Sequence, residues 1–432
     1  MIRLLAILGG LSGAMDLGTG APLDESLLRC VLAARLAGAV GCADQEVRTA
    51  LHVSLLEHLG CTAASHEATR VFGDDISVVR HSFAADPTRS SDLLRAFVPG
   101  VAAASGRGRV RTLVAALRAA GDPGPPRATC EVASDAARRL GLGEDVERAL
   151  AHVTAAWNGK GYPTVGGEGI PLATRIAHVA GTAVLVALGA DAAAAHAELR
   201  RRAGTQLDPR LVEACTPELI DGVLGATPDP LDVVLDLEPD PVRLVGDGQL
   251  HEVARTFGDL VDLKSPRLHG HSAAVAGLAA DAAARLRPAD PGRLRLAGHL
   301  HDVGRIGVPT RIWEKTGPLT RTERDQARLH PYYTERILAR TPELADVAAI
   351  AGGHHERCDG SGYHRGLRAP DLTVESRILA AADAYRLLVE EPGASGIRPD
   401  SAHPPWRMPY RRDLRLGSEH RRCRATGRRA SR

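Results

Sequence analysis

Three short sequence elements occur twice in this chain, in the same order and far apart. Residues 156–163 (A-W-N-G-K-G-Y-P) are echoed by the second part of residues 353–364 (G-H-H-E-R-C-D-G-S-G-Y-H). In the same way, residues 55–61 match 299–305, and residues 170–176 match 372–378. Self-similarity of this kind predicts a duplicated structural unit. The chain is therefore expected to fold as two related domains.

The spacing of apolar residues predicts that both units are helical. Apolar side chains recur at helical intervals through both halves, and alternating runs typical of strands are almost absent. We expect an all-α protein of two helical bundles in tandem. The expected parts are a first domain at 1–195, a connector of short helices with several prolines at 196–249, a second domain at 250–391 and a disordered, Arg-rich tail at 392–432.

A set of histidines and aspartates marks the second half only. Each ligand or adjacent pair lies on a different predicted helix or at its end, about one helix and a loop from the next. A single inward-facing histidine is usually a satisfied core residue, but five helices that each deliver one indicate a metal site, because unpaired buried charge is costly. The candidate ligands are His271, His301, Asp302, His330, His354, His355 and Asp383.

The chemistry of these ligands restricts the metal and the reaction. Imidazole and carboxylate ligands without a thiolate suit iron, manganese or zinc, and nickel and cobalt also stay open. Iron or manganese is favoured. Because a carboxylate can bridge, seven ligands are enough for two divalent ions. Such a pair orients a phosphate and activates a water, so the predicted reaction is hydrolysis of a phosphoester.

The motifs H-L-H-D-V-G-R-I-G-V-P, H-P-Y-Y-T-E-R-I-L, H-H-E-R-C-D-G-S-G-Y and R-I-L-A-A-A-D-A-Y resemble the HD-GYP subgroup of HD-domain phosphohydrolases, over about residues 250–390. The resemblance implies an all-helical fold, two or three metal ions that are often iron, and hydrolysis of cyclic di-GMP. It also implies that all seven candidates are metal ligands and that Asp302 is the bridging carboxylate. Arg305 stands where the family has a lysine that faces phosphate, so Asp302 and Arg305 are the predicted catalytic residues.

The second half also departs from the family pattern at three places. The turn ends in Tyr363 and His364 instead of Tyr-Pro, and we assign both residues, with Arg305, to substrate binding. For His364, an alternative role as a solvated loop residue stays open. Arg267 replaces a glutamate found in members with three metals, so a third ion is not expected. After its last Asp the family has a segment with Arg or Lys that holds the dinucleotide's phosphates, whereas here residues 390–396 lead into a tail that does not resemble it.

In the first half, the positions that match the metal ligands have changed. By sequence, Arg29 matches His271, and the remaining matched positions are Glu57, His58, Val153, Thr154 and Gly181. This half is therefore predicted to be a degenerate, non-catalytic copy that serves as a scaffold or as a regulatory or dimerisation surface. The arrangement resembles that of tandem-domain actinobacterial members of the family.

The leading hypothesis is a metal-dependent phosphodiesterase that acts on a cyclic dinucleotide. The alternatives are a phosphohydrolase for another nucleotide or phosphoester, and a non-catalytic sensor that retains the metal site. Scattered cysteines without a C-x-x-C pair indicate a cytoplasmic protein. A homodimer is considered, no membrane span is expected, and nucleic-acid binding is not expected because the basic tail has no helix-turn-helix pattern.

Overall fold

The fold is helical throughout the part that the computed structural model describes, which comprises residues 1–225, 229–286 and 289–390. Within these residues, two short strands, β1 (Ile2–Arg3) and β2 (Leu244–Val245), pair antiparallel and place Ile2 opposite Val245. The predicted all-α class is confirmed. The predicted Arg-rich tail at 392–432 lies outside the described residues.

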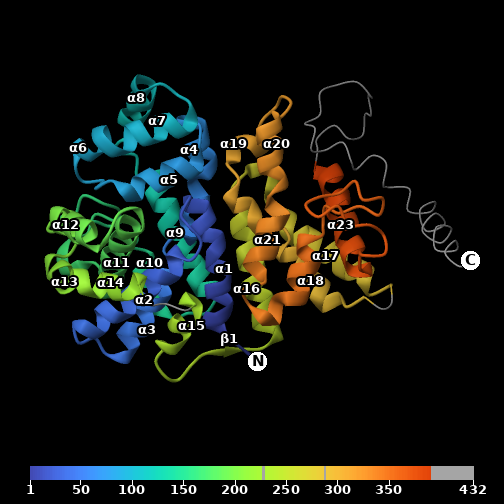
Figure 1. Cartoon of the computed structure of the whole chain (residues 1–432), viewed down its shortest axis with the longest axis horizontal. Helices are drawn as coiled ribbons and strands as arrows, with labels where there is room; N and C mark the ends of the chain where they lie inside the picture. Colours follow the sequence, from blue (N-terminus) through green and yellow to red (C-terminus); the bar gives the residue numbers. More distant parts are fainter. Residues whose placement is uncertain (226–228, 287–288, 391–432) are drawn as a thin grey trace, which may run out of the picture.

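The first half, at the left of Figure 1, consists of a bundle with an inserted group of helices. The inserted helices have a small core of their own, in which Phe72 meets Phe97 edge to face. The bundle contains α1 (Leu4–Thr19), α2 (Glu25–Ala39), α3 (Asp44–Leu56), η1 (Leu59–Ala64), α9 (Gly124–Arg139), α10 (Glu144–Leu150), η3 (Gly167–Gly169) and α11 (Leu172–Gly189). The insertion contains α4 (Ser65–Phe72), α5 (Asp75–Ala84), α6 (Ser90–Asp92), η2 (Leu93–Phe97), α7 (Val98–Ser105) and α8 (Arg109–Ala119).

The predicted connector packs on the first half. Its helices are α12 (Ala192–Arg202), α13 (Pro209–Ala214), α14 (Pro217–Leu224) and α15 (Pro230–Asp236). Leu199, Ile220 and Val234 are fully buried in the same core as α2 and α11. Prolines stand in the first turns of α13, α14 and α15. Because the residue before a proline disfavours the helical conformation, these prolines start new helices and keep the segments from joining into one long helix. The predicted domain boundaries stay predictions.

The second half is a more compact bundle and lies at the right of Figure 1. It contains α16 (Asp247–Asp262), η4 (Pro266–Leu268), α17 (His271–Ala283), α18 (Pro291–Leu300), η5 (Val303–Gly307), α19 (Thr310–Trp313), α20 (Arg321–Arg328), α21 (His330–Leu338), η6 (Pro342–Leu344), α22 (Ala345–Gly352) and α23 (Val374–Glu390).

The structure shows how the repeated units correspond. At the end of α1, Asp16 accepts hydrogen bonds from the backbone N–H and the hydroxyl of Ser26. At the end of α16, Asp262 accepts the same pair of bonds from Ser272. The same spacing in sequence separates the two partners in each half, so α1 matches α16 and α2 matches α17.

This register corrects one correspondence made from the sequence. Ser26 pairs with Ser272, so Glu25 is the residue that matches His271. Arg29, which we had matched to His271, lies one turn further along α2. The error arose because the sequence comparison had no element that fixed the register of α2, whereas the Asp–Ser hydrogen bonds fix it.

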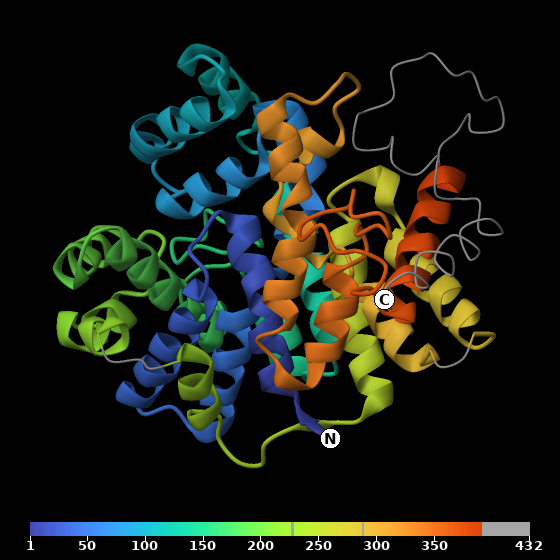
Figure 2. The same ribbon diagram turned by 45° about the vertical axis from the view of Figure 1, so that its right-hand side comes forward.

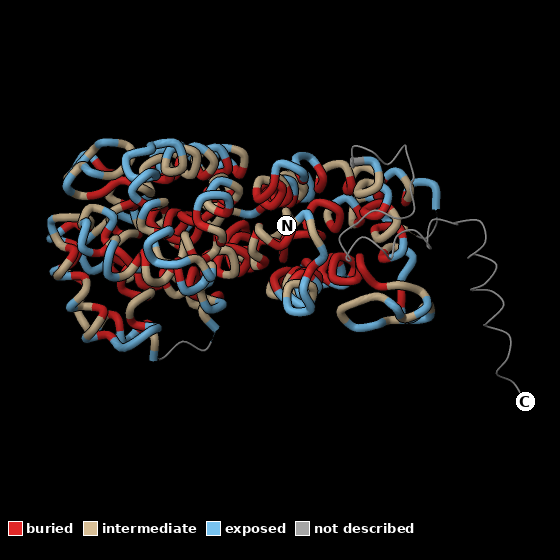
Figure 3. The backbone as a smooth tube through the Cα atoms, turned by 90° about the horizontal axis from the view of Figure 1, so that it is seen from above, coloured by how far each residue is buried: buried red, intermediate tan, exposed pale blue. Residues whose placement is uncertain are grey.

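The two halves share a continuous hydrophobic core. Helix α1 lies between them and contacts α2 and α3 on one side and α21 and η5 on the other. Viewed from above, buried backbone runs from one lobe into the other at this helix (Figure 3). The buried ammonium of Lys264 lies 3.0 Å from a carboxylate oxygen of Asp75, so a desolvated ion pair also joins the insertion to the second half.

Helix α11 is long and apolar enough to cross a membrane by length and composition alone. In this fold, however, it packs against α2, α3 and α12, and Ile176, Val179 and Val184 are fully buried. Its apolar character is accounted for by its place in the core.

Close helix packing next to the second-half ligands gives a stability prediction. A Cβ on Gly298 of α18 would lie 2.4 Å from the Cα of Ala276 in α17, so Gly298→Ala must push the helices apart. We expect a loss of about 1–3 kcal/mol in unfolding free energy, measured by denaturant titration.

The matched control is Gly277→Ala in α17, where a Cβ meets no atom within 4 Å. This change should be neutral or stabilising by up to about 1 kcal/mol, because alanine has the higher helix propensity. Equal stability of the two variants would contradict the close contact between α17 and α18.

Candidate metal centre

The fold brings all seven predicted ligands to one buried point. His271 begins α17, His301 and Asp302 join α18 to η5, His330 begins α21, His354 and His355 follow α22, and Asp383 lies within α23. None of the seven is more than 5% exposed. Five separate segments therefore each contribute one ligand or an adjacent pair, as the sequence spacing predicted.

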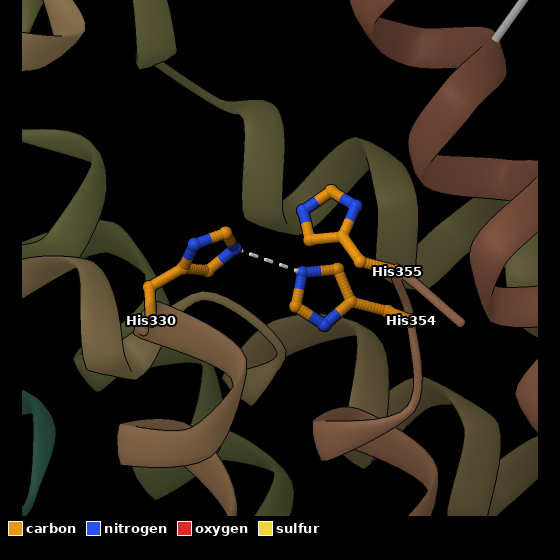
Figure 4. A group of neighbouring side chains, drawn as sticks. All are labelled: His330, His354 and His355. Atoms are coloured by element: carbon orange, nitrogen blue, oxygen red, sulfur yellow. Dashed lines mark hydrogen bonds between the residues drawn. The ribbon is translucent and has the colours of Figure 1, made fainter. Parts of the chain in front are cut away.

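The ligand atoms fall into two groups. His330, His354 and His355 form one group, and His271, His301 and Asp302 form the other, each close enough to hold a single ion. In Figure 4 the three rings of the first group face one another, with 3.2 Å between Nε2 of His330 and Nε2 of His354. Two metal sites side by side are the simplest account of this arrangement.

Asp302 lies between the two groups. Its Oδ1 is 3.4 Å from His330 Nε2 and 3.5 Å from His354 Nε2. Its Oδ2 is 3.2 Å from His301 Nε2 and 3.8 Å from His271 Nε2. Each oxygen therefore faces a different group, which is the geometry of a bridging carboxylate. Asp383 joins the second group, with its Oδ1 3.3 Å from His271 Nε2.

Backbone carbonyls orient three of the imidazoles. The Nδ1 atoms of His301, His330 and His354 lie 2.8, 2.6 and 2.6 Å from the carbonyl oxygens of Gly298, Ala327 and Ala351, each three residues earlier in the chain. Because a carbonyl can only accept, Nδ1 must carry the proton. The Nε2 lone pair then points into the site, as a metal ligand requires.

This proton assignment tests whether the residues fit a metal. A neutral His301 presents a lone pair at Nε2 to the negatively charged Oδ2 of Asp302, and neither atom has a hydrogen bond of good geometry. Two buried acceptors that face each other repel unless a cation lies between them. The donor set, its burial and these unsatisfied atoms all fit divalent metal ions.

The protonation states agree with this fit. Burial raises the pKa of Asp302, but Arg305 and the neighbouring imidazoles outweigh burial and hold that pKa well below its usual value. Burial lowers the pKa of His330 to about 3, and it also lowers the pKa of His355 far below its usual value. The carboxylate is thus ionised and these two imidazoles neutral near pH 7, which is the form that binds metal.

Arg305 lies against the centre, as predicted for a residue that faces phosphate. Its Nε is 2.9 Å from Oδ2 of Asp302, and its guanidinium lies 4.7 Å from the centre of the Trp313 ring. Trp313 also meets His330 edge to face. The tryptophan therefore positions both a ligand and the arginine, and it packs the loop after the metal helix.

The two predicted substrate residues of the turn have different surroundings. The ring of Tyr363 stacks on His355 with 4.8 Å between centroids, so it borders the metal centre. His364 points elsewhere: its Nε2 is 3.4 Å from a carboxylate oxygen of Glu335, and its ring meets Tyr332. Substrate contact by His364 remains a prediction that the fold does not favour.

Glu356 is a residue whose role the sequence did not indicate. Its buried carboxylate accepts hydrogen bonds from the backbone N–H groups of Arg365, Gly366 and Leu367, at 2.7, 3.2 and 2.8 Å. It thereby holds the turn that carries Tyr363. Only the position of Glu356 directly after the His pair could have suggested this, and that signal is weak.

A family model described as the HD domain matches residues 255–403. The second half contains an HD domain. The matched range includes all seven residues of the metal centre.

Relatives of the HD domain are named as cyclic dinucleotide phosphodiesterases. The 3′3′-cGAMP-specific phosphodiesterase 3 of Vibrio cholerae is 29% identical over 392 residues, which is 88% of this chain and 85% of that protein. A cyclic di-GMP phosphodiesterase of Thermotoga maritima is 35% identical over 144 residues, 32% of this chain and 39% of that protein.

A solved structure shares the fold of both halves. The crystal structure of a cyclic GMP-AMP-specific phosphodiesterase of V. cholerae matches with a TM-score of 0.62 and 26% identity, and it covers 90% of this chain and 89% of its own. The two proteins therefore share their helical fold over most of both chains.

The bridging position of Asp302 gives a prediction about metal content. Asp302→Asn removes the charge that both groups share, so the affinity for metal should fall by more than the about 10–100-fold typical of changes around a metal's ligands. Elemental analysis of the purified protein should show loss of most bound metal. His269→Ala, at an exposed histidine just before the ligand, should leave the content unchanged. Full metal occupancy in Asp302→Asn would contradict the bridging assignment.

A second prediction concerns the turn that Glu356 holds. In Glu356→Gln, one oxygen becomes an amide that faces a backbone N–H, so the unfolding free energy should fall by about 1–3 kcal/mol. Hydrogen exchange at residues 363–367 should also become faster. Asp359→Asn changes another carboxylate of this loop, one that accepts a single backbone bond from Ser361, and should have a smaller effect on both readouts.

Proposed function

We propose that this protein is a metal-dependent phosphodiesterase that hydrolyses a 3′,5′-linked cyclic dinucleotide. The observation that carries the proposal is the pair of ligand groups that the two oxygens of Asp302 join. The relatives named as cyclic dinucleotide phosphodiesterases support it, because they are 29% and 35% identical to this chain over 392 and 144 residues.

The residues of the site have different roles in the proposed reaction. Two divalent metals held here would supply Lewis acidity and lower the pKa of a bound water. Asp302 and Asp383 set the charge that holds the cations, and the carbonyl-bound imidazoles fix the direction of the ligand atoms. Arg305 places a guanidinium beside Asp302, where it binds an oxygen of the scissile phosphate and stabilises the charge that develops there. Because these side chains are buried, the local dielectric constant is low, and the electrostatic interactions between these charges are strong.

Among cyclic dinucleotides, the comparisons favour 3′3′-cGAMP as a substrate beside cyclic di-GMP. One relative named for 3′3′-cGAMP matches both halves of this chain. Two others named for 3′3′-cGAMP match segments of about one domain, as do the relatives named for cyclic di-GMP. We therefore propose that 3′3′-cGAMP is hydrolysed at least as efficiently as cyclic di-GMP. The basic phosphate-binding segment that the family has after its last ligand is not recognisable here, which supports a substrate preference of its own.

Several finer points belong to the same proposal. The ions are two in number, with iron or manganese favoured by the nitrogen and oxygen ligands and zinc open. The first half is non-catalytic, because both candidate metal groups among the described residues lie in the second half. A cytoplasmic location and a homodimer are also proposed. The cytoplasmic location follows from the scattered, unpaired cysteines of the described part.

Arg305 provides the test of this function. With manganese-loaded protein and each cyclic dinucleotide as substrate, Arg305→Ala should lower kcat by about 10²–10³-fold, because it removes a positive charge from the transition state. Arg305→Lys should retain more activity, since it keeps the charge but loses the planar fork. Turnover is followed by chromatography of the linear product.

The control for this test is Arg321→Ala, at an exposed position on α20, which should leave kcat unchanged. Metal content should be the same in all of these proteins. A fully metal-loaded wild type that hydrolyses neither cyclic dinucleotide would overturn the proposed substrate and favour another phosphoester.

A further inference from the structure

The first half contains a cavity of about 650 Å³ at the place that corresponds to the metal centre. The bundle forms its floor, and the inserted helices α4 and α5 and the segment after α8 form its other walls. Binding sites for small molecules commonly have volumes of about 300–1,000 Å³. The residues that matter for the argument are Arg29, Glu57, His58, Phe83, Lys160 and Tyr162, all of which line the cavity.

An arginine fills the place that the metal ligands occupy in the other half. Nη1 of Arg29 lies 3.0 Å from a carboxylate oxygen of Glu57 and also contacts Nε2 of His58. Glu57 and His58 match His301 and Asp302 in the repeat. Gly181, which matches Asp383, leaves room for this group: a Cβ there would lie 3.2 Å from Glu57 and 3.6 Å from Arg29.

The floor of the cavity has polar atoms that the protein does not satisfy. Arg29 is 2% exposed and His58 is 5% exposed. Even so, Nε of Arg29 and Nδ1 of His58 have no hydrogen-bond partner in the described part of the chain. Buried donors without a partner are costly, and both atoms belong to side chains that line the cavity. Both atoms are themselves shielded from solvent, but their side chains line the cavity, so the floor has donor capacity that the described part of the protein leaves unused.

The cavity presents cationic groups that an anion can contact. Each buried carboxylate of the lining already has a cation: Arg29 for Glu57, Arg80 for Glu25 and Lys264 for Asp75. Lys160 is exposed at the mouth, on the turn that matches the HD domain's Gly-Tyr turn. It makes no ion pair with any residue that the structure describes. The exposed carboxylate of Asp122 also lines the cavity, so the lining has no excess positive charge, but Lys160 at the rim and Arg29 on the floor both offer a cation to an anionic ligand.

The walls favour a ligand with a flat apolar part. The ring of Phe83 lies 4.3 Å from that of His58, and Tyr162 and several prolines complete the lining. Aromatic side chains next to cations are the usual surroundings of a nucleobase and its phosphate.

The cavity is connected to the HD domain through one buried ion pair. Asp75, a lining residue, accepts hydrogen bonds from the backbone N–H and the hydroxyl of Thr310, and its carboxylate pairs with Lys264. The ammonium of Lys264 in turn donates to the carbonyls of Ile306 and Val308, at 2.8 and 3.1 Å. These carbonyls belong to η5 and the residue that follows it, the segment that directly follows Asp302 and includes Arg305.

We propose that this cavity is an effector site for a nucleotide, and that its occupation is transmitted to the metal centre through Asp75 and Lys264. The binding step is independent of the proposed function. The effect of the nucleotide on the metal centre can be measured as a change in metal affinity as well as a change in turnover.

Binding is tested in the Asp302→Ala protein after removal of metal by a chelator, so that neither metal nor turnover contributes. The probes for calorimetry are GMP, AMP, cyclic di-GMP and 3′3′-cGAMP. At least one should bind with one molecule per chain. Lys160→Glu in this background should weaken that binding about tenfold or more, because it replaces a cation at the rim with an anion.

The matched control is Arg118→Glu, which makes the same charge change on an exposed residue of α8 outside the cavity. It should leave the affinity unchanged. Phe83→Ala gives a second, uncharged test and should also weaken binding. Failure of all four probes to bind, or binding that neither Lys160→Glu nor Phe83→Ala weakens, would overturn the site.

Transmission is tested by titrating Mn²⁺ into the metal-free protein, with Asp302 intact, in the presence and absence of the bound nucleotide. The metal affinity should change about fivefold or more, and linkage requires the nucleotide affinity to change by the same factor. The change should vanish in Lys160→Glu. In Asp75→Asn with Lys264→Met, which removes both charges together, the nucleotide should still bind without affecting the metal. An unchanged metal affinity in the protein that has Asp75 and Lys264 would overturn the regulatory assignment.

Discussion

The carboxylate of Asp302 is the constraint on which the second half depends. It is 1% exposed, and its ionised form is surrounded by imidazoles whose lone pairs point toward it. A buried ion costs several kcal/mol unless opposite charge compensates it, and Arg305 provides only part of that charge. Five segments converge there, and divalent cations complete the balance. Bound metal ions would therefore stabilise the folded second half as well as take part in the reaction.

In the first half, the buried carboxylate at the corresponding place is compensated in a different way. There the duplicated helices surround a guanidinium in place of ions, and Arg29 satisfies Glu57 without any metal. A fixed organic cation keeps the fold closed but cannot activate water. At corresponding positions, the first half thus compensates buried charge with an arginine, and the second half has ligand groups that fit metal ions. The arrangement in the first half also leaves the space above Arg29 open to other ligands.

Much of this could be predicted from the sequence. The helical class follows from apolar spacing, and the ligand set follows from histidines and aspartates on separate helices. The register of α2 could not be predicted, because the Asp16–Ser26 contact that sets it has no distinct sequence signature. Glu356 was missed for a similar reason, since its partners are backbone N–H groups, which any residue can supply. The cavity depends on where an insertion folds, and local patterns do not specify long-range packing.

The carbonyl contacts of the imidazoles have a consequence for the way the centre is filled. Since His301, His330 and His354 already have the required tautomer and ring direction, an arriving ion does not have to wait for a ring to turn or a proton to move. Little ordering entropy is lost when the ion binds. The rate of loading is then set by access through the protein and by dehydration of the ion. Such a centre discriminates between metals mainly by size and ligand preference, because its rigid shape adapts little to a poorly matched ion.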